Sequence, residues 1–304
     1  MTTHRPRSPL AATLLVAASA LCFGSVSTLT LVGTGAGASL PTLIMWRYVL
    51  AAPLLLVAAG QRRPAVAVPR GVRWRIILMG GGGQAIVTAL TLLSLRWVPA
   101  ATEAFLFFTF PAFVTILAAL RGTERLTGAR AIALLLALGG IGIMVGSPGA
   151  ASLDPRGVAL VIGGALAYAI YIPMIDGLRR ASNAPFTSAW LSVGAAVVFG
   201  TWALLDRSLF VALPARSVLA AVALALFCTA AAFLLFLRGL AVLGPVRTAI
   251  VCTLEPFWTS VLAALVLGQP ITGRTLAGGA LIAGAVLLLQ RGSTVDPEDI
   301  AAAT

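Results

Sequence analysis

The chain has 304 residues, of which 60% are hydrophobic and only 10% are charged. Soluble domains contain about 25% charged residues, so this composition excludes a soluble globular protein. The formal net charge of +12 comes from arginines, which lie mostly between apolar segments and form no patch interleaved with aromatic side chains. Nucleic acid is therefore excluded as a partner, and the lipid bilayer is the expected environment.

Ten apolar segments follow one another along the chain, each close to the roughly 20 residues that a helix needs to cross a bilayer. Their apolar residues are continuous and do not alternate with polar ones, as they would in a membrane strand. We therefore predict an all-α membrane protein with ten transmembrane helices. In chain order the predicted spans are 9–31, 40–59, 76–95, 100–120, 129–147, 157–177, 185–205, 217–237, 245–266 and 274–290.

The second half of the chain repeats the first. Residues 95–145 align with residues 240–290, so that Pro111 falls on Pro256. Five spans per repeat is an odd number, so the second repeat enters the membrane from the opposite side, which predicts two inverted five-helix repeats with a binding site where they meet. The predicted segments are a tail at 1–8, repeats at 9–147 and 157–290, an outer linker at 148–156 and a tail at 291–304.

The arginines also set the orientation. With the N-terminus inside, most of the 21 arginines fall in cytoplasmic segments, as the positive-inside rule requires. Both tails are therefore predicted to be cytoplasmic, in a multi-pass protein of the cytoplasmic (inner) membrane. The first apolar run is too long for the core of a signal peptide, so we expect an uncleaved first span.

The usual catalytic groups are missing from the sequence. Cys22, Cys228 and Cys252 all lie inside predicted spans without a C-x-x-C spacing, and His4, in the N-terminal tail, is the single histidine. This pattern predicts no metal site and no cofactor, and it argues against an enzyme. The glycine run at 80–83 lacks the Lys-Ser/Thr of a phosphate loop, so we expect close helix packing or local flexibility there.

Polar side chains form helical stripes in the third and ninth spans. Threonines and cysteine in such stripes can simply bond one helix to another. Glu255 differs, because an ionised carboxylate at mid-span costs at least a few kcal/mol unless a partner or water meets it. It is therefore a candidate for a substrate or proton role. The stripes consist of Gln84, Thr88 and Thr91, and of Thr248, Cys252, Glu255 and Thr259.

Across the repeat, each polar stripe aligns with positions rich in phenylalanine, and two tyrosines of the sixth span add hydroxyl-bearing rings. If these faces meet, they enclose a cavity with aromatic walls, a few hydrogen-bonding groups and one acid, which suits a small amphipathic metabolite. For each phenylalanine taken alone, a lipid-facing or ordinary packing role is the favoured interpretation. The candidate substrate-cavity residues are Gln84, Thr88, Phe107, Phe110, Tyr168, Tyr171, Thr229, Phe233, Cys252 and Glu255.

Two prolines and two charged residues complete the candidate set. Pro111 and Pro256 each remove one backbone hydrogen bond at about mid-depth and bend their helices, either as hinges beside a shared cavity or as plain packing kinks. Arg47 lies inside the second span and Glu103 inside the fourth. The arginine can reach the outer interface, pair with Glu103 or contact substrate.

Several residue groups resemble the motifs of a known family. Phe23-Gly24-Ser25 is similar to a Trp-Gly-Ser element, and Trp46-Arg47-Tyr48 is similar to an Arg-aromatic element. The repeat ending is similar in Glu255-Pro256, Gly268-Gln269-Pro270-Ile271-Thr272 and Gly278-Gly279, and it recurs as Pro111, Gly122-Thr123-Glu124-Arg125-Leu126 and Gly139-Gly140. In these motifs the chain resembles the EamA-type branch of the drug/metabolite transporter superfamily, across essentially residues 9–290.

The resemblance implies ten helices, cytoplasmic termini and a central cavity among spans 1, 3, 4, 6, 8 and 9. It also implies export of amino acids or related metabolites, and the aromatic faces favour a member like the aromatic amino-acid exporters. The chain departs from the pattern at Phe110, where an acid is frequent, and at Gln269, where a Gly-Glu-Arg turn is usual. The first departure argues against a symmetric scheme with two carboxylates.

Together these features predict a secondary transporter that exports small organic metabolites, foremost apolar or aromatic amino acids, by alternating access. The alternatives are another metabolite or drug class and, with less support, a non-transporting scaffold, a receptor or a lipid-handling enzyme. Small-residue spacings at Gly142-x-x-x-Gly146 and Ala280-x-x-x-Gly284 suit close packing, within one molecule or in a homodimer. Substrate identity, proton coupling and the resting conformation are left open.

Overall fold

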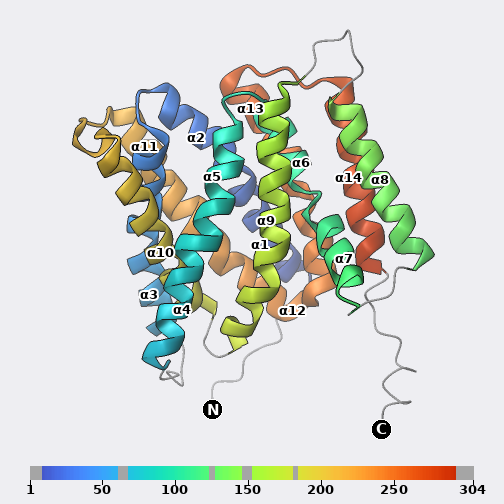
Figure 1. The fold of residues 1–304 in the computed structure, drawn as a ribbon, viewed down its shortest axis with the longest axis horizontal. Helices are drawn as coiled ribbons and strands as arrows, with labels where there is room; N and C mark the ends of the chain where they lie inside the picture. The colour runs from blue at the N-terminus through green and yellow to red at the C-terminus, as the bar shows by residue number, and fades with distance from the viewer. Residues whose placement is uncertain (1–8, 61–67, 123–126, 146–152, 181–183, 292–304) are drawn as a thin grey trace.

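The computed structural model describes residues 9–60, 68–122, 127–145, 153–180 and 184–291. The predicted N-terminal tail, with His4, and the predicted C-terminal tail beyond Arg291 therefore lie outside the described residues, as do Gly146 and most of the predicted linker. The described residues contain helices and no strand, which agrees with the predicted all-α class. The helices stand side by side as a bundle (Figure 1).

The first half contains long apolar helices interrupted at defined points. Helical hydrogen bonding satisfies the backbone groups within each helix away from these points, as the interior of a bilayer requires. The elements are α1 (Pro9–Gly24), α2 (Val26–Gly35), α3 (Leu40–Gly60), α4 (Arg70–Met79), the π-helix η1 (Gly80–Gln84), α5 (Ala85–Ser94), α6 (Ala100–Phe107), α7 (Phe110–Leu120) and α8 (Gly128–Val145).

The second half follows a similar order. The elements are α9 (Pro155–Arg180), α10 (Ala184–Leu205), the short 3-10 helix η2 (Ser208–Phe210), α11 (Ala215–Ala225), the π-helix η3 (Leu226–Ala231), α12 (Ala232–Cys252), α13 (Leu254–Leu267) and α14 (Gly273–Arg291).

Among the described residues, seven helical segments are long and apolar enough to cross a membrane. Three shorter apolar helices accompany them, at Ala131–Ile143, Leu254–Leu267 and Gly273–Leu288. Large apolar side chains such as Leu135 and Leu265 are exposed on the outside of the bundle. Apolar exposure of this extent marks a surface that meets lipid.

One predicted boundary was wrong. The predicted spans 217–237 and 245–266 leave a loop between them, but α12 continues through this region as one helix. Gly239 lies directly against α1, where an added Cβ would overlap the Val16 side chain, so this part of α12 is held by packing.

The two halves contact each other reciprocally. α3 packs against α10, its counterpart in the second repeat, and α8 packs against α14. The contact of α1 with α12 is matched by that of α9 with α5 when the halves are exchanged. Such exchange is what a pseudo-two-fold relation between repeats produces.

The two π-helices lie at equivalent places in the repeat. The alignment that matches Gln84 with Thr229 puts η1 over most of η3. In η1 the predicted close packing of the glycine run is confirmed, because a Cβ on Gly80 would overlap the backbone of Leu191 in α10. Single π-turns inside α-helices occur frequently at functional sites. The pair of π-helices therefore indicates a candidate functional site between the two halves.

The two glycines Gly142 and Gly284 of the predicted small-residue spacings do not form the close contact between α8 and α14. A Cβ added to Gly142 or Gly284 would meet no atom within 4 Å. The close approach uses Gly140 instead, whose added Cβ would lie 2.7 Å from the carbonyl oxygen of Gly278. The contact therefore uses Gly140 and Gly278, each two residues before the start of a predicted spacing, Gly142 and Ala280.

Candidate functional site

A central cavity of about 700 Å³ lies where the two halves meet. Its wall takes side chains from both repeats, and it has the size usual for small-molecule sites, about 300–1,000 Å³. The structure brings all ten candidate residues to this one cavity, and their part in binding substrate stays a prediction. They are Gln84, Thr88, Phe107, Phe110, Tyr168, Tyr171, Thr229, Phe233, Cys252 and Glu255.

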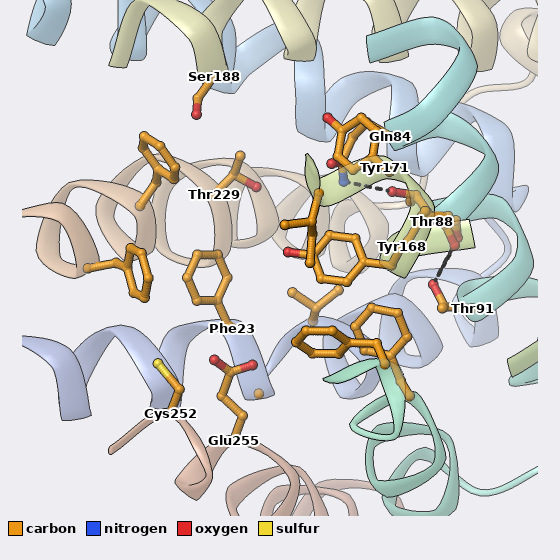
Figure 2. Close-up of a pocket in the computed structure, with 18 of the residues that line it drawn as sticks. Phe23, Gln84, Thr88, Thr91, Tyr168, Tyr171, Ser188, Thr229, Cys252 and Glu255 are labelled. Carbon is orange, nitrogen blue, oxygen red and sulfur yellow. Dashed lines mark hydrogen bonds between the residues drawn. The ribbon is translucent and has the colours of Figure 1, made fainter. Parts of the chain in front are cut away.

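One side of the cavity carries a small hydrogen-bond network. Gln84, the last residue of η1, donates from Nε2 to Thr88 Oγ1 at 3.3 Å and to the Tyr48 hydroxyl at 3.4 Å. The Tyr48 hydroxyl and Thr88 Oγ1 lie 2.9 Å apart. Thr91, the third member of the stripe, donates to the Val87 carbonyl of its own helix at 2.9 Å. Figure 2 shows Gln84, Thr88 and Thr91 together on one side of the cavity.

Glu255 and Cys252 face the cavity from another side, beside Phe23 (Figure 2). Glu255 lies in the first turn of α13, directly after the helix break at Thr253. Among the described residues, no hydrogen-bond donor and no cation partners its carboxylate. The nearby Thr248 Oγ1 is buried and also has no partner among them. In this part of the cavity wall, Glu255 and Thr248 therefore both lack a hydrogen-bonding partner among the described side chains.

Aromatic rings form a continuous wall. Phe107 and Phe110, on either side of the break between α6 and α7, have ring centroids 5.7 Å apart. Tyr168 packs on both, at 5.4 Å and 4.9 Å, and stacks with Tyr171 at 6.2 Å. Tyr171 also lies against η1, where a Cβ on Gly83 would overlap its ring. These rings offer an apolar surface to a bound molecule.

The helices are interrupted next to both prolines. α6 ends at Phe107 and α7 begins at Phe110, just before Pro111. α12 ends at Cys252 and α13 begins at Leu254, just before Pro256. Pro111 lines the cavity and Pro256 is buried. At both places the gap is only one or two residues long, and Thr109 and Thr253 keep right-handed helical dihedral angles. The expected bends are therefore short interruptions of the helix, and a hinge role for them stays a prediction.

A third break, between α1 and α2, is fastened to α13. The hydroxyl of Ser25 accepts a hydrogen bond from Trp258 Nε1 at 3.0 Å. Thr259 Oγ1 donates to the Gly24 carbonyl at 2.7 Å. Gly24 is required here, because an added Cβ would lie 2.7 Å from the carbonyl oxygen of Glu255. The break in the first span therefore helps to position the backbone that carries Glu255.

Arg47 and Glu103 both line the cavity without pairing with each other. Arg47 is 8% exposed, and its Nε donates to Thr229 Oγ1 at 2.9 Å. Its guanidinium carbon lies 5.3 Å from the centroid of the Tyr48 ring. Glu103 is 5% exposed and accepts a hydrogen bond from Ser27 Oγ at 2.7 Å. The pairing of Arg47 with Glu103, one of the three expected arrangements, is therefore not seen in this structure, and a contact of Arg47 with substrate stays a prediction.

Sequence analysis did not identify several wall residues from the second and seventh spans. These two spans were not among those that the resemblance assigned to the cavity. Tyr48 follows Arg47 on α3, and Ser188 and Ser192 lie near the start of α10. The i, i+4 spacing of the two serines was a usable signal for a polar helix face. Among the described residues, no group of three or more His, Cys, Asp or Glu side chains could hold a metal ion.

These observations describe a multi-pass helical membrane protein with a central cavity built from two repeats. The sequence profile of the EamA-like transporter family matches residues 10–146 and again residues 155–291. The chain therefore belongs to the EamA-like transporter family. It is a membrane transporter of small molecules rather than an enzyme.

The comparison with solved structures supports the fold. One chain, described only as "Crystal structure of protein", superposes with a TM-score of 0.65 at 19% sequence identity. The match covers 95% of this chain and 100% of the other. None of the curated proteins compared with the chain matches it.

Proposed function

We propose that the protein exports small zwitterionic metabolites, foremost amino acids with apolar or aromatic side chains, across the cytoplasmic membrane. The observation that carries this proposal is a pair of opposite charges in one aromatic-walled cavity. Arg47 and Glu255 both line it, and neither has an oppositely charged partner among the described residues. A ligand with one positive and one negative group satisfies both.

The carboxylate of the substrate binds Arg47. The guanidinium uses Nε on Thr229 and makes no other hydrogen bond to a described residue. A buried charge without a counter-ion is costly, and removing one partner of a buried pair typically costs about 3–5 kcal/mol. A carboxylate supplies that counter-ion and matches the fork of the guanidinium in a bidentate contact.

The ammonium group binds Glu255. Glu103 is the other acid on the wall, but its carboxylate already accepts a hydrogen bond from Ser27. The side chain of the substrate then packs on the rings of Phe107, Phe110 and Tyr168. This arrangement favours large apolar or aromatic side chains, since they cover the most apolar wall.

Alternating access follows from ten spans arranged as two inverted repeats. The reciprocal packing of α3 with α10 and of α1 with α12 supports this arrangement. In this arrangement the three shorter apolar helices are taken as the fifth, ninth and tenth spans, beside the seven longer ones. When the halves exchange conformations, the cavity opens to the other side of the membrane. The arginine distribution supports cytoplasmic termini.

Flux of a labelled amino-acid panel through proteoliposomes tests the proposal, with and without an imposed pH gradient. We expect flux of large apolar and aromatic amino acids and little flux of small or acidic ones. Acceleration by the gradient indicates proton coupling, for which Glu255 is the candidate, and an unchanged rate indicates facilitated diffusion. No flux across the panel, from folded protein, would contradict amino-acid export and move the substrate to another metabolite class.

A further inference from the structure

A second cavity of about 550 Å³ lies among α2, α3, α5 and α10. Its walls include the ends of α2 and α10 and the start of α3, which under the proposed orientation lie on the outer side. Leu92 of α5 is the one described residue that lines both this cavity and the central one. The two cavities therefore lie in series, with a single side chain common to both walls.

The second cavity is lined by one buried hydroxyl and by two charged side chains of opposite sign. Thr30 is 2% exposed, and its Oγ1 has no partner among the described residues. Leaving a buried hydroxyl unpaired costs about 1–3 kcal/mol. Arg96 and Asp206 are exposed on the wall of the same cavity and form no ion pair with each other or with another described residue, while Asp206 Oδ1 accepts the backbone N–H of Ser208 at 2.9 Å.

An apolar barrier separates the cavities. Leu92 is 5% exposed and packs in one cluster with Ile44, Met45 and Tyr48. Tyr48 is also on the wall of the central cavity, where its hydroxyl meets Thr88. A polar molecule cannot cross this layer unless the side chain of Leu92 or the helix that carries it moves.

We propose that the second cavity is an outer station on the transport route, which binds the zwitterion between Arg96 and Asp206 after it passes Leu92. This inference rests on the proposed function. Arg96 takes the carboxylate and Asp206 takes the ammonium group, while Thr30 supplies a hydroxyl. The second site thus repeats the charge pattern of the central one.

Labelling of an introduced cysteine tests the station. Thr34→Cys places a thiol on its wall, and Val211→Cys, at a position that is 60% exposed and outside the cavity, is the matched control. A membrane-impermeant thiol reagent is added from outside, and labelling of the unsubstituted chain is subtracted. L-phenylalanine at ten times its Kd should slow labelling of Thr34→Cys about tenfold and leave Val211→Cys unchanged. Phenethylamine and 3-phenylpropionate, which each lack one charge, should protect far less.

Two further variants separate this station from the central site. In a Glu255→Gln background, protection of Thr34→Cys should persist while flux falls. In an Asp206→Asn background, protection should be lost, with labelling of Val211→Cys as the folding control. Loss of protection with Glu255→Gln, or no protection in a protein that transports, would overturn the station and leave export standing. Protection without flux would support the station and contradict export.

Discussion

Two consecutive side chains of α3 reach equivalent positions in the two halves. Arg47 donates to Thr229, and the Tyr48 hydroxyl accepts a hydrogen bond from Gln84. Gln84 and Thr229 are aligned by the repeat, and each lies in a π-helix. Arg47 and Tyr48 therefore contact both repeats from the wall of the central cavity.

The first prediction at this scale concerns Glu255. Glu255→Gln keeps the shape of the side chain but removes its charge and its ability to exchange a proton. A hydrogen bond to a charged group contributes about 1.5–3 kcal/mol, so flux of L-phenylalanine at low concentration should fall roughly tenfold or more. Any acceleration by a pH gradient should disappear as well.

Asp154→Asn provides a matched control for this change. Asp154 precedes α9, and its Oδ1 accepts the backbone N–H of Arg156 at 2.8 Å. Asparagine caps helices as well as aspartate does, so this variant should fold and transport normally. Wild-type flux in Glu255→Gln would remove Glu255 from the substrate and proton path.

Arg47 gives a second prediction, about recognition rather than rate. Arg47→Gln should abolish the preference for L-phenylalanine over phenethylamine, because the carboxylate loses its partner. Arg47→Lys keeps the charge but loses the bidentate fork, so its preference should be intermediate. Competition by both compounds against labelled L-phenylalanine measures this preference. An unchanged preference in Arg47→Gln would show that the carboxylate binds elsewhere.

At the scale of the helices, the glycines of η1 differ in how closely they approach a neighbouring helix. Gly80 lets η1 approach α10, since a Cβ there would overlap the Leu191 backbone. Gly194 makes the reciprocal approach from α10, where a Cβ would overlap the Ile77 carbonyl oxygen. Gly82, by contrast, has no neighbouring atom within 4 Å of an added Cβ.

The pair Gly80→Ala and Gly82→Ala separates packing from backbone flexibility. Gly80→Ala should destabilise the protein by about 1–3 kcal/mol through overpacking. Gly82→Ala should be neutral or stabilising, because alanine is favoured over glycine inside a helix by about 0.5–1 kcal/mol. Thermal unfolding in detergent measures both. Equal stability of the two variants would mean that the approach to α10 relaxes at no cost.

Helix interruptions and π-turns were harder to predict from sequence than the helices themselves. Hydropathy located the helices, and the repeat alignment with the polar stripes selected side chains such as Gln84 and Glu255 that line one cavity. Ser188 was missed because its place on the wall depends on the packing of α10. The loop expected near Gly239 was wrong because contact with α1 maintains the helix there.

At the scale of the whole molecule, the reciprocal packing makes the two proline breaks equivalent. Pro111 and Pro256 follow breaks at matching positions of the two halves. In inverted repeats that exchange conformations, the same change in each half acts on opposite faces of the membrane. Pro111→Ala and Pro256→Ala should therefore shift the equilibrium between the inward-open and outward-open states in opposite directions.

Labelling of Thr34→Cys from outside, in the absence of substrate, reports this equilibrium. One proline variant should raise the labelling rate and the other should lower it, while Val211→Cys reacts equally in both. A shift in the same direction, or no shift, would mean that the breaks are packing kinks rather than hinges of an alternating-access cycle.

The π-helix η1 also determines which side of α5 faces the cavity. An α-helix turns by about 100° and rises about 1.5 Å per residue. A π-turn holds one residue more than an α-helical turn, and it adds less than this rise to the length of the helix. If η1 relaxed to α-helical geometry while α4 stayed in place on α10, α5 would rotate by roughly that angle. Thr88 would then leave the cavity and an apolar face of the helix would replace it. One glycine more or less in the run at 80–83 would therefore change the chemistry of the wall without replacing any side chain on it.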